Sequence, residues 1–176
     1  MPLWRMLVGE LLHGPRTIDG PDPDPLAIEH LATQLGERAR ARLGRSLCIR
    51  EVDAGSCNGC ELEIHAVNGP VYDLERFGIR FVASPRHADM LLVTGPVSLN
   101  MAEALQRTYD AVPAPKWVVA MGECAIDGGC FAGGYAVMNG VNAVLPVDMV
   151  IRGCPPSPEK LLRGLLALLE STATGR

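Results

Sequence analysis

The sequence predicts an α/β domain built on an open parallel sheet with helices on both faces. Short apolar segments alternate with helical segments from residue 47 onward, which is typical of strands that are each followed by a covering helix. Two of the segments, Met90–Gly95 and Lys116–Met121, are apolar at almost every position. Strands of this kind are buried on both faces, which is the usual setting of a parallel sheet.

Five segments are predicted as strands because they are short and apolar. They are residues 47–52, 79–82, 90–95, 116–121 and 147–151. Three helices accompany them. The first runs over residues 61–67, the second follows the capping residue Ser98, and the third is rich in leucine and runs from Ser157 and Pro158 to about Glu170.

Residues 1–46 are predicted to form an N-terminal extension that clamps a neighbouring subunit, and residues 47–176 form the α/β domain. The alternating prolines of Pro21–Pro25 cannot continue a helix or a central strand, so they predict an extended linker. Asp24 then caps an amphipathic helix that carries four arginines near its end. These are Arg38, Arg40, Arg42 and Arg45. They form either a solvated face or a docking surface for an acidic partner.

The composition is that of an ordinary globular protein. Of the 176 residues, 48% are apolar and 20% are charged, and the net charge is −4, so no nucleic-acid partner is expected. No apolar run reaches the ~18 residues that span a bilayer, and the N-terminus lacks the cleavage site of a secretory signal. We therefore expect a cytoplasmic protein that reaches a membrane through its partners or through its amphipathic first dozen residues.

Four of the six cysteines lie in loops that directly follow predicted strands. Cys57 and Cys60 form a Cys-x-x-Cys pair after the first strand, Cys124 follows the fourth strand, and Cys154 follows the fifth. Sites in open parallel sheets form just beyond the carboxyl ends of the strands. Because disulfides are disfavoured in a reducing compartment, clustered cysteines there indicate metal ligands or reactive groups.

Taken alone, the pair Cys57 and Cys60 fits a redox dithiol, half of a zinc site or half of an iron–sulfur site. A structural zinc site usually closes with a second closely spaced pair, whereas Cys124 and Cys154 are single and far apart. Cys154 also precedes a proline, as iron–sulfur ligands often do. The sequence therefore predicts one 4Fe–4S cluster on these four cysteines. A zinc-stabilised assembly module and unliganded structural cysteines are the alternatives.

The remaining cysteines are not predicted as ligands. Cys48 lies inside a predicted strand, where a free cysteine acts as a small hydrophobic residue. Cys130, six residues after Cys124, is expected to be a small side chain packed near the site. Glu123 directly precedes a ligand and either hydrogen-bonds within its loop or tunes the cluster. No catalytic residue is assigned, because motifs of hydrolases, kinases and nucleotide-binding enzymes are missing.

The motifs around these cysteines resemble those of a known family. They are, in order, Gly55–Glu61, Gly122–Ala125, Gly128-Gly129 and Gly153–Glu159. The same order is shared by the B-type subunit of complex I and the small subunits of NiFe hydrogenases. The spaced Cys57 and Cys60 are similar to the hydrogenases, since the complex I subunit is expected to carry two adjacent cysteines there. Val141–Asp148 is more like complex I. This mixture resembles the membrane-bound, energy-converting hydrogenases of the formate hydrogenlyase type.

The resemblance implies a flavodoxin-like domain with a single 4Fe–4S cluster at the carboxyl ends of the strands. It implies an electron-transfer small subunit of an oxidoreductase, placed beside a NiFe-hydrogenase-like large subunit that contains the active centre. A ferredoxin-like iron–sulfur subunit and membrane subunits would complete the complex, on the cytoplasmic face of the inner membrane. The alternative is the equivalent subunit of a complex I-like quinone oxidoreductase or of a nickel-free ion-pumping relative.

Overall fold

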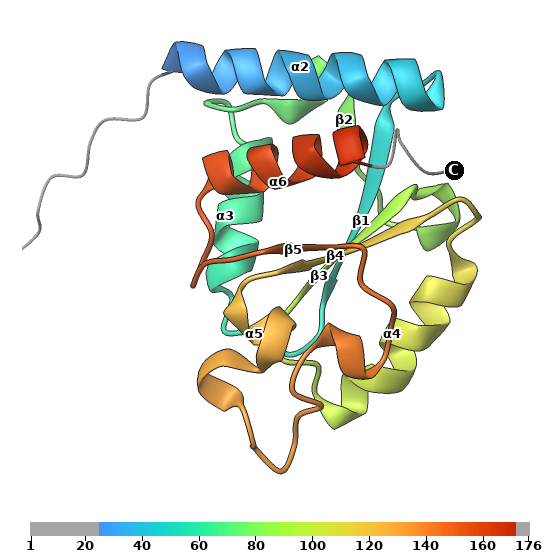
Figure 1. Ribbon diagram of the computed structural model, residues 1–176, viewed down its shortest axis with the longest axis vertical. Helices are drawn as coiled ribbons and strands as arrows, with labels where there is room; N and C mark the ends of the chain where they lie inside the picture. Colours follow the sequence, from blue (N-terminus) through green and yellow to red (C-terminus); the bar gives the residue numbers. More distant parts are fainter. Residues whose placement is uncertain (1–24, 172–176) are drawn as a thin grey trace, which may run out of the picture.

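The computed structural model describes residues 25–171, and a five-stranded parallel sheet forms its centre (Figure 1). The strands are β1 (Leu47–Asp53), β2 (Ile79–Phe81), β3 (Met90–Thr94), β4 (Trp117–Met121) and β5 (Met149–Ile151). Their order across the sheet is β2-β1-β3-β4-β5, and every neighbouring pair runs parallel. This is the flavodoxin-like order, so the predicted fold class is confirmed.

Helices cover both faces of the sheet (Figure 1). On one face lie α2 (Pro25–Leu43), α3 (Gly59–Asn68) and α6 (Pro158–Ser171); on the other lie α4 (Leu99–Ala111) and the short α5 (Glu123–Asp127). Four 3₁₀ turns complete the connections: η1 (Leu74–Phe77), η2 (Pro85–His87), η3 (Gly129–Phe131) and η4 (Val141–Ala143). Among residues 25–171, no helix is both long enough and apolar enough to cross a bilayer.

Alternate residues of the central strands supply two hydrophobic cores. On β3, Met90 and Leu92 pack toward α2, α3 and α6, whereas Leu91 and Val93 pack toward α4. All five residues of β3 are buried, and so are all five of β4. This burial on both faces explains why the two strands are continuous apolar runs in the sequence.

The helix α2 lies along α6 and shares its core with the sheet (Figure 1). Ile28, Ala32, Leu35 and Ala39 are spaced three or four residues apart and form its buried stripe. The remainder of the predicted extension, residues 1–24 with the apolar start and most of the proline-rich linker, lies outside the described residues. Within residues 25–171, therefore, the helix of the extension is packed against the α/β domain.

Three of the four arginines near the end of α2 have partners within this chain. They are Arg38, Arg42 and Arg45, and their partners are, in order, Glu170 at 3.6 Å, the Leu169 carbonyl oxygen at 3.2 Å and Asp89. The Arg42 guanidinium also lies 5.1 Å from the centre of the Trp117 ring. These contacts connect the extension helix and the residues that follow it to α6, β3 and β4.

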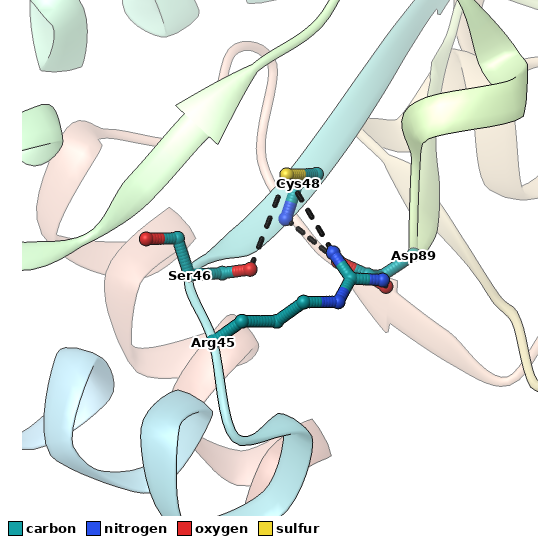
Figure 2. A network of polar contacts seen from close by, with 4 residues as sticks. All are labelled: Arg45, Ser46, Cys48 and Asp89. Carbon is teal, nitrogen blue, oxygen red and sulfur yellow. Dashed lines mark hydrogen bonds and ion pairs between the residues drawn. The ribbon is translucent and has the colours of Figure 1, made fainter.

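Asp89 joins three strands at the amino edge of the sheet (Figure 2). Its carboxylate is 6% exposed, pairs with Arg45 at 2.5 Å, and accepts a hydrogen bond from the backbone N–H of Cys48 at 2.9 Å. Its own N–H donates to the Cys48 carbonyl oxygen, and its carbonyl oxygen accepts from the N–H of Trp117. Cys48 is thus part of the fold's framework: it lies in β1 as expected, half-buried, at the edge opposite the other cysteine loops.

Two segments differ from their predicted structure. The fifth strand begins at Met149 and not at residue 147, because the Asp148 carboxylate accepts the Val118 N–H at 2.8 Å in place of a backbone carbonyl. Residues 123–143 form α5, η3 and η4, three short helical pieces that the sequence did not predict. They lack the length and the apolar periodicity by which helices are recognised.

Replacing Gly36 with alanine is expected to destabilise the chain. Alanine favours helix by about 1 kcal/mol relative to glycine. However, a Cβ at position 36 of α2 would lie 2.2 Å from the Phe77 carbonyl oxygen in η1. Overpacking of this kind costs about 1–3 kcal/mol, so we expect a lower midpoint in urea unfolding.

The matched control is Ala41→Gly on the exposed side of α2, where only helix propensity of up to about 1 kcal/mol is lost. If Gly36→Ala were as stable as the unmodified chain, the close packing of α2 on η1 would be contradicted.

Candidate iron–sulfur site

The first cysteine loop connects β1 to α3 and contains the Cys-x-x-Cys segment Cys57–Cys60. One carboxylate oxygen of Asp53 accepts hydrogen bonds from the N–H groups of Gly55 (2.8 Å) and Ser56 (2.7 Å). Asn58 has a φ of +69°, a left-handed conformation that asparagine tolerates better than most residues. The loop therefore turns directly from the end of β1 into α3, and the two cysteines lie on either side of that turn.

The second loop follows β4 and contains Cys124 in the first turn of α5. Gly122 has a φ of +88° and donates its N–H to the carbonyl oxygen of Ile151 at 2.9 Å. The next N–H, of Glu123, donates to the carbonyl oxygen of Gly153 at 3.0 Å. These two bonds attach the second loop to the end of β5, where the third loop begins.

The third loop contains Cys154 and leads into α6, whose first turn is capped by Ser157. It also approaches the first loop: a Cβ on Gly59 would lie 3.6 Å from the Cys57 sulfur and 3.8 Å from the ring of Pro155. The structure therefore brings all three cysteine loops together at the carboxyl edge of the sheet.

The four predicted ligand thiols are close enough to affect one another's ionisation. Burial raises the pKa of Cys60 to about 12, with smaller contributions from the charge of Glu61 and from the other three thiols. Burial also raises the pKa of Cys124, with smaller contributions that include the charge of Cys130. Each thiolate thus opposes formation of the next, and metal cations would remove this repulsion when they bind.

Two glycines leave the space that two of the sulfur atoms occupy. A Cβ on Gly122 would lie 2.7 Å from the Cys60 sulfur, and a Cβ on Gly129 would lie 3.1 Å from the Cys124 sulfur. The Cys60 thiol also lies 3.8 Å from the carbonyl oxygen of Met121. Glycine is therefore required at these positions for room beside the sulfurs as well as for backbone conformation.

Glu61 adds a buried negative group next to Cys60. It is 5% exposed, and neither carboxylate oxygen has a hydrogen-bond partner among residues 25–171. Buried polar atoms normally have a partner, so packing of the fold alone does not account for this carboxylate. Its charge also raises the pKa of Glu51 on β1, after burial, which is the larger cause.

The spacing of the site is wider than one metal ion requires. Among residues 25–171, no group of three or more His, Cys, Asp or Glu side chains is close enough to hold a single ion. A tetrahedral zinc at ~2.3 Å from each sulfur needs sulfurs about 3.8 Å apart. Four thiols that meet at one edge without closing to that distance fit a larger centre with several irons.

Glu123 has a partner in the next loop. Its carboxylate accepts a hydrogen bond from the Arg152 guanidinium at 2.9 Å, so the residues before Cys124 and Cys154 are joined by their side chains as well as by their backbones. Both side chains remain partly exposed, and ion pairs of this kind contribute little to stability. The hydrogen-bonding role expected for Glu123 therefore has a direct structural basis.

Cys130 is closer to the site than the sequence suggested. Its thiol is hydrogen-bonded to that of Cys124, six residues earlier. The chain returns because Gly128 and Gly129 have φ values of +90° and +51°, which most side chains do not tolerate. The Gly-Gly pair between two cysteines was the signal in the sequence that indicated this turn.

The region that contains all four predicted ligands matches a known family. Residues 57–168 match the family described as NADH ubiquinone oxidoreductase, 20 Kd subunit. This chain belongs to that family. The match begins at Cys57 and ends within α6, so it includes all three cysteine loops.

Relatives of this family member are named as hydrogenase and quinone oxidoreductase subunits. It is 40% identical to formate hydrogenlyase subunit 7 of Escherichia coli (strain K12), covering 94% of this chain and 66% of the relative. It is 45% identical to the probable membrane-bound hydrogenase subunit mbhJ of Pyrococcus furiosus, covering 74% and 78%. It is 49% identical to the B-type subunit of the NADH-quinone oxidoreductase of Clostridium beijerinckii, covering 63% and 66%. The chain thus spans just under two thirds of the length of formate hydrogenlyase subunit 7.

Solved structures share the fold of this family member. A chain in the structure of the membrane-bound sulfane sulfur reductase, an archaeal respiratory membrane complex, is 34% identical, with a TM-score of 0.67 over 88% of this chain and 78% of that one. A chain of an NAD⁺-reducing [NiFe]-hydrogenase is 22% identical, with a TM-score of 0.57 over 72% and 93%. The second likeness shows the fold alone.

Alkylation of the metal-free chain is expected to distinguish Cys60 from the other cysteines. A thiol with a pKa of about 12 is protonated at neutral pH and gains thiolate about tenfold per pH unit up to that value. The rate of Cys60 modification by iodoacetamide should therefore still be rising between pH 9 and 10, where an ordinary thiol levels off. Mass spectrometry of each cysteine peptide measures this rate. A plateau for Cys60 near pH 9 would contradict the raised pKa.

Replacing Gly122 with alanine is expected to lower the amount of iron bound per chain by at least about half. The added Cβ would occupy space 2.7 Å from the Cys60 sulfur and displace that thiol. The matched control is Gly133→Ala, which also has a positive φ (+76°) but would meet no atom within 4 Å. Iron analysis of the two purified variants tests this, and equal loss in both would assign the effect to backbone strain.

Proposed function

We propose that this chain holds one 4Fe–4S cluster on Cys57, Cys60, Cys124 and Cys154. In this proposal it is the electron-transfer small subunit next to the catalytic large subunit of a membrane-bound, energy-converting NiFe hydrogenase complex. Members of its family bind an iron–sulfur cluster, and such a cluster exchanges electrons with neighbouring redox centres when it is bound. The chain itself would hold, shield and tune the cluster, while the active centre lies in the large subunit.

The observation that carries the proposal is the meeting of four thiols from three loops at one edge of the sheet. Cys60 is half-buried behind Gly122, whereas Cys57 and Cys154 are exposed. The site therefore has a protected inner side and an open outer side. An electron-transfer centre needs such an open side, because a partner's redox centre has to approach it closely.

Several exposed apolar side chains near these loops support docking of a large partner. Leu62, two residues after Cys60, is 61% exposed. In the loop after Cys130, Phe131 is 41% exposed and Tyr135 is 98% exposed. Exposed apolar groups gathered near a site mark a protein–protein contact. We propose that the NiFe-hydrogenase-like large subunit covers them.

The wider assembly follows from the relatives. Their names and titles include a membrane-bound hydrogenase and a respiratory membrane complex. We propose that a ferredoxin-like iron–sulfur subunit and membrane subunits are the further partners, and that the complex places this chain on the cytoplasmic face of the inner membrane. The residues 1–46 would form the extension that clamps a neighbouring subunit.

The hydrogenase branch is favoured over the quinone oxidoreductase branch by two observations. The formate hydrogenlyase relative aligns with 94% of this chain, whereas the quinone oxidoreductase relative from Clostridium aligns with 63%. The spaced pair Cys57 and Cys60 is the hydrogenase-like form of the first motif. The nickel ligands belong to the large subunit, so its cysteines decide between the hydrogenase and a nickel-free relative.

Metal analysis of the anaerobically purified complex tests the proposal. We expect about four irons and four acid-labile sulfides per copy of this chain, and no zinc. Serine at any of the four ligand positions should lower the iron and sulfide of this subunit by at least about half. The control is Cys48→Ser, at the opposite edge of the sheet, which should retain both. One zinc without sulfide would replace the proposal with a zinc-stabilised assembly module.

A further inference from the structure

We propose that the thiol of Cys130 donates an S–H···S hydrogen bond to the sulfur of Cys124 when that sulfur ligates the cluster, and that this bond raises the cluster's reduction potential. Cys130 would thus be a positioning and tuning residue and not a fifth ligand. The inference rests on the proposed function, because it requires a cluster on Cys124.

The turn that joins the two cysteines has a defined geometry. After α5 ends at Asp127, the N–H of Gly128 donates to the Cys124 carbonyl oxygen at 3.0 Å. The Asp127 carboxylate accepts the N–H of Gly129 at 2.9 Å. The backbone at Gly129 passes so close to Cys124 that an added Cβ would lie 3.1 Å from its sulfur. The next residue, Cys130, therefore lies beside the Cys124 sulfur.

The direction of the hydrogen bond depends on whether Cys124 carries a proton. In the metal-free chain, the contact with Cys130 is among the causes that raise the pKa of Cys124, so the Cys124 thiol retains its proton and donates it toward Cys130. A metal-bound cysteine is a thiolate and has no proton to donate. Cys130 is then the donor of the pair, and a thiol is able to donate, if weakly.

Cys130 is suited to tuning because it is exposed and outside the four-thiol set. Each of the other three ligand positions follows a strand or a helix start, whereas Cys130 lies in η3 behind Cys124. A hydrogen bond to a ligand sulfur stabilises the added negative charge of the reduced cluster and so raises its potential. The neighbouring Glu61 carboxylate acts in the opposite direction if it is charged, since negative charge disfavours reduction.

The expected effect is modest and measurable. A weak S–H hydrogen bond should change the ratio of reduced to oxidised cluster about two- to fivefold, which is a shift of about 20–40 mV for a one-electron couple. The Cys130→Ala variant should move the midpoint to lower potential by this amount. The Cys130→Ser variant keeps a hydroxyl donor and should have the unmodified midpoint or a higher one.

The experiment is an EPR-monitored redox titration of the anaerobically purified complex. The signal that is lost in the Cys57→Ser complex identifies the cluster of this subunit. The complexes with Cys130→Ala and Cys130→Ser are then compared with Cys48→Ala, a cysteine at the opposite edge of the sheet that should leave the midpoint unchanged. Iron and sulfide are measured on each complex in parallel.

The outcomes are distinct. A lower midpoint for Cys130→Ala, full iron content and recovery in Cys130→Ser would support the inference. An unchanged midpoint in Cys130→Ala, or an equal shift in both variants, would overturn it while the proposed function stands. Loss of iron in Cys130→Ala would also overturn it, because Cys130 would then be a ligand. Absence of iron from the unmodified subunit would overturn the proposed function and this inference together.

Discussion

Parallel strand pairing is the constraint on which the site depends. Because β1, β4 and β5 run in the same direction, their carboxyl ends lie at one edge, and every loop that leaves them starts from the same place. Cysteines separated by 30 or more positions in the chain can therefore act as a single group. In an antiparallel sheet the same loops would be divided between opposite edges, and no common site would form.

The loops are held by polar contacts at the backbone and not by burial. Asp53 fixes the first loop, and the N–H groups of Gly122 and Glu123 attach the second loop to the end of β5. Glycine at positions 122 and 129 leaves space for sulfur where any side chain would collide with it. The result is a region whose sequence is restricted at nearly every position, while its thiols remain partly exposed to a partner.

Stability and function are placed at opposite edges of the same sheet. At the amino edge, Asp89 joins the backbones of β1 and β4 and pairs with Arg45, and α2 packs on α6 nearby. At the carboxyl edge, the thiols and Glu61 bring negative groups together with no cation beside Glu61 among the described residues. A fold can accept such an unfavourable arrangement at one edge only when the packing of its two cores stabilises the remainder.

The sequence by itself determined the strand segments, the α/β class and the four cysteines that the loops present, because apolar runs and loop cysteines are local features of the chain. It also indicated where the cysteines would meet, since parallel strands end at one edge. Tertiary structure alone decided the contact of Cys130 with Cys124, the pairing of Glu123 with Arg152, the isolation of Glu61 and the start of β5 at Met149. Each of these depends on distances between side chains from separate segments or across a tight turn, and the order of residues along the chain does not contain those distances.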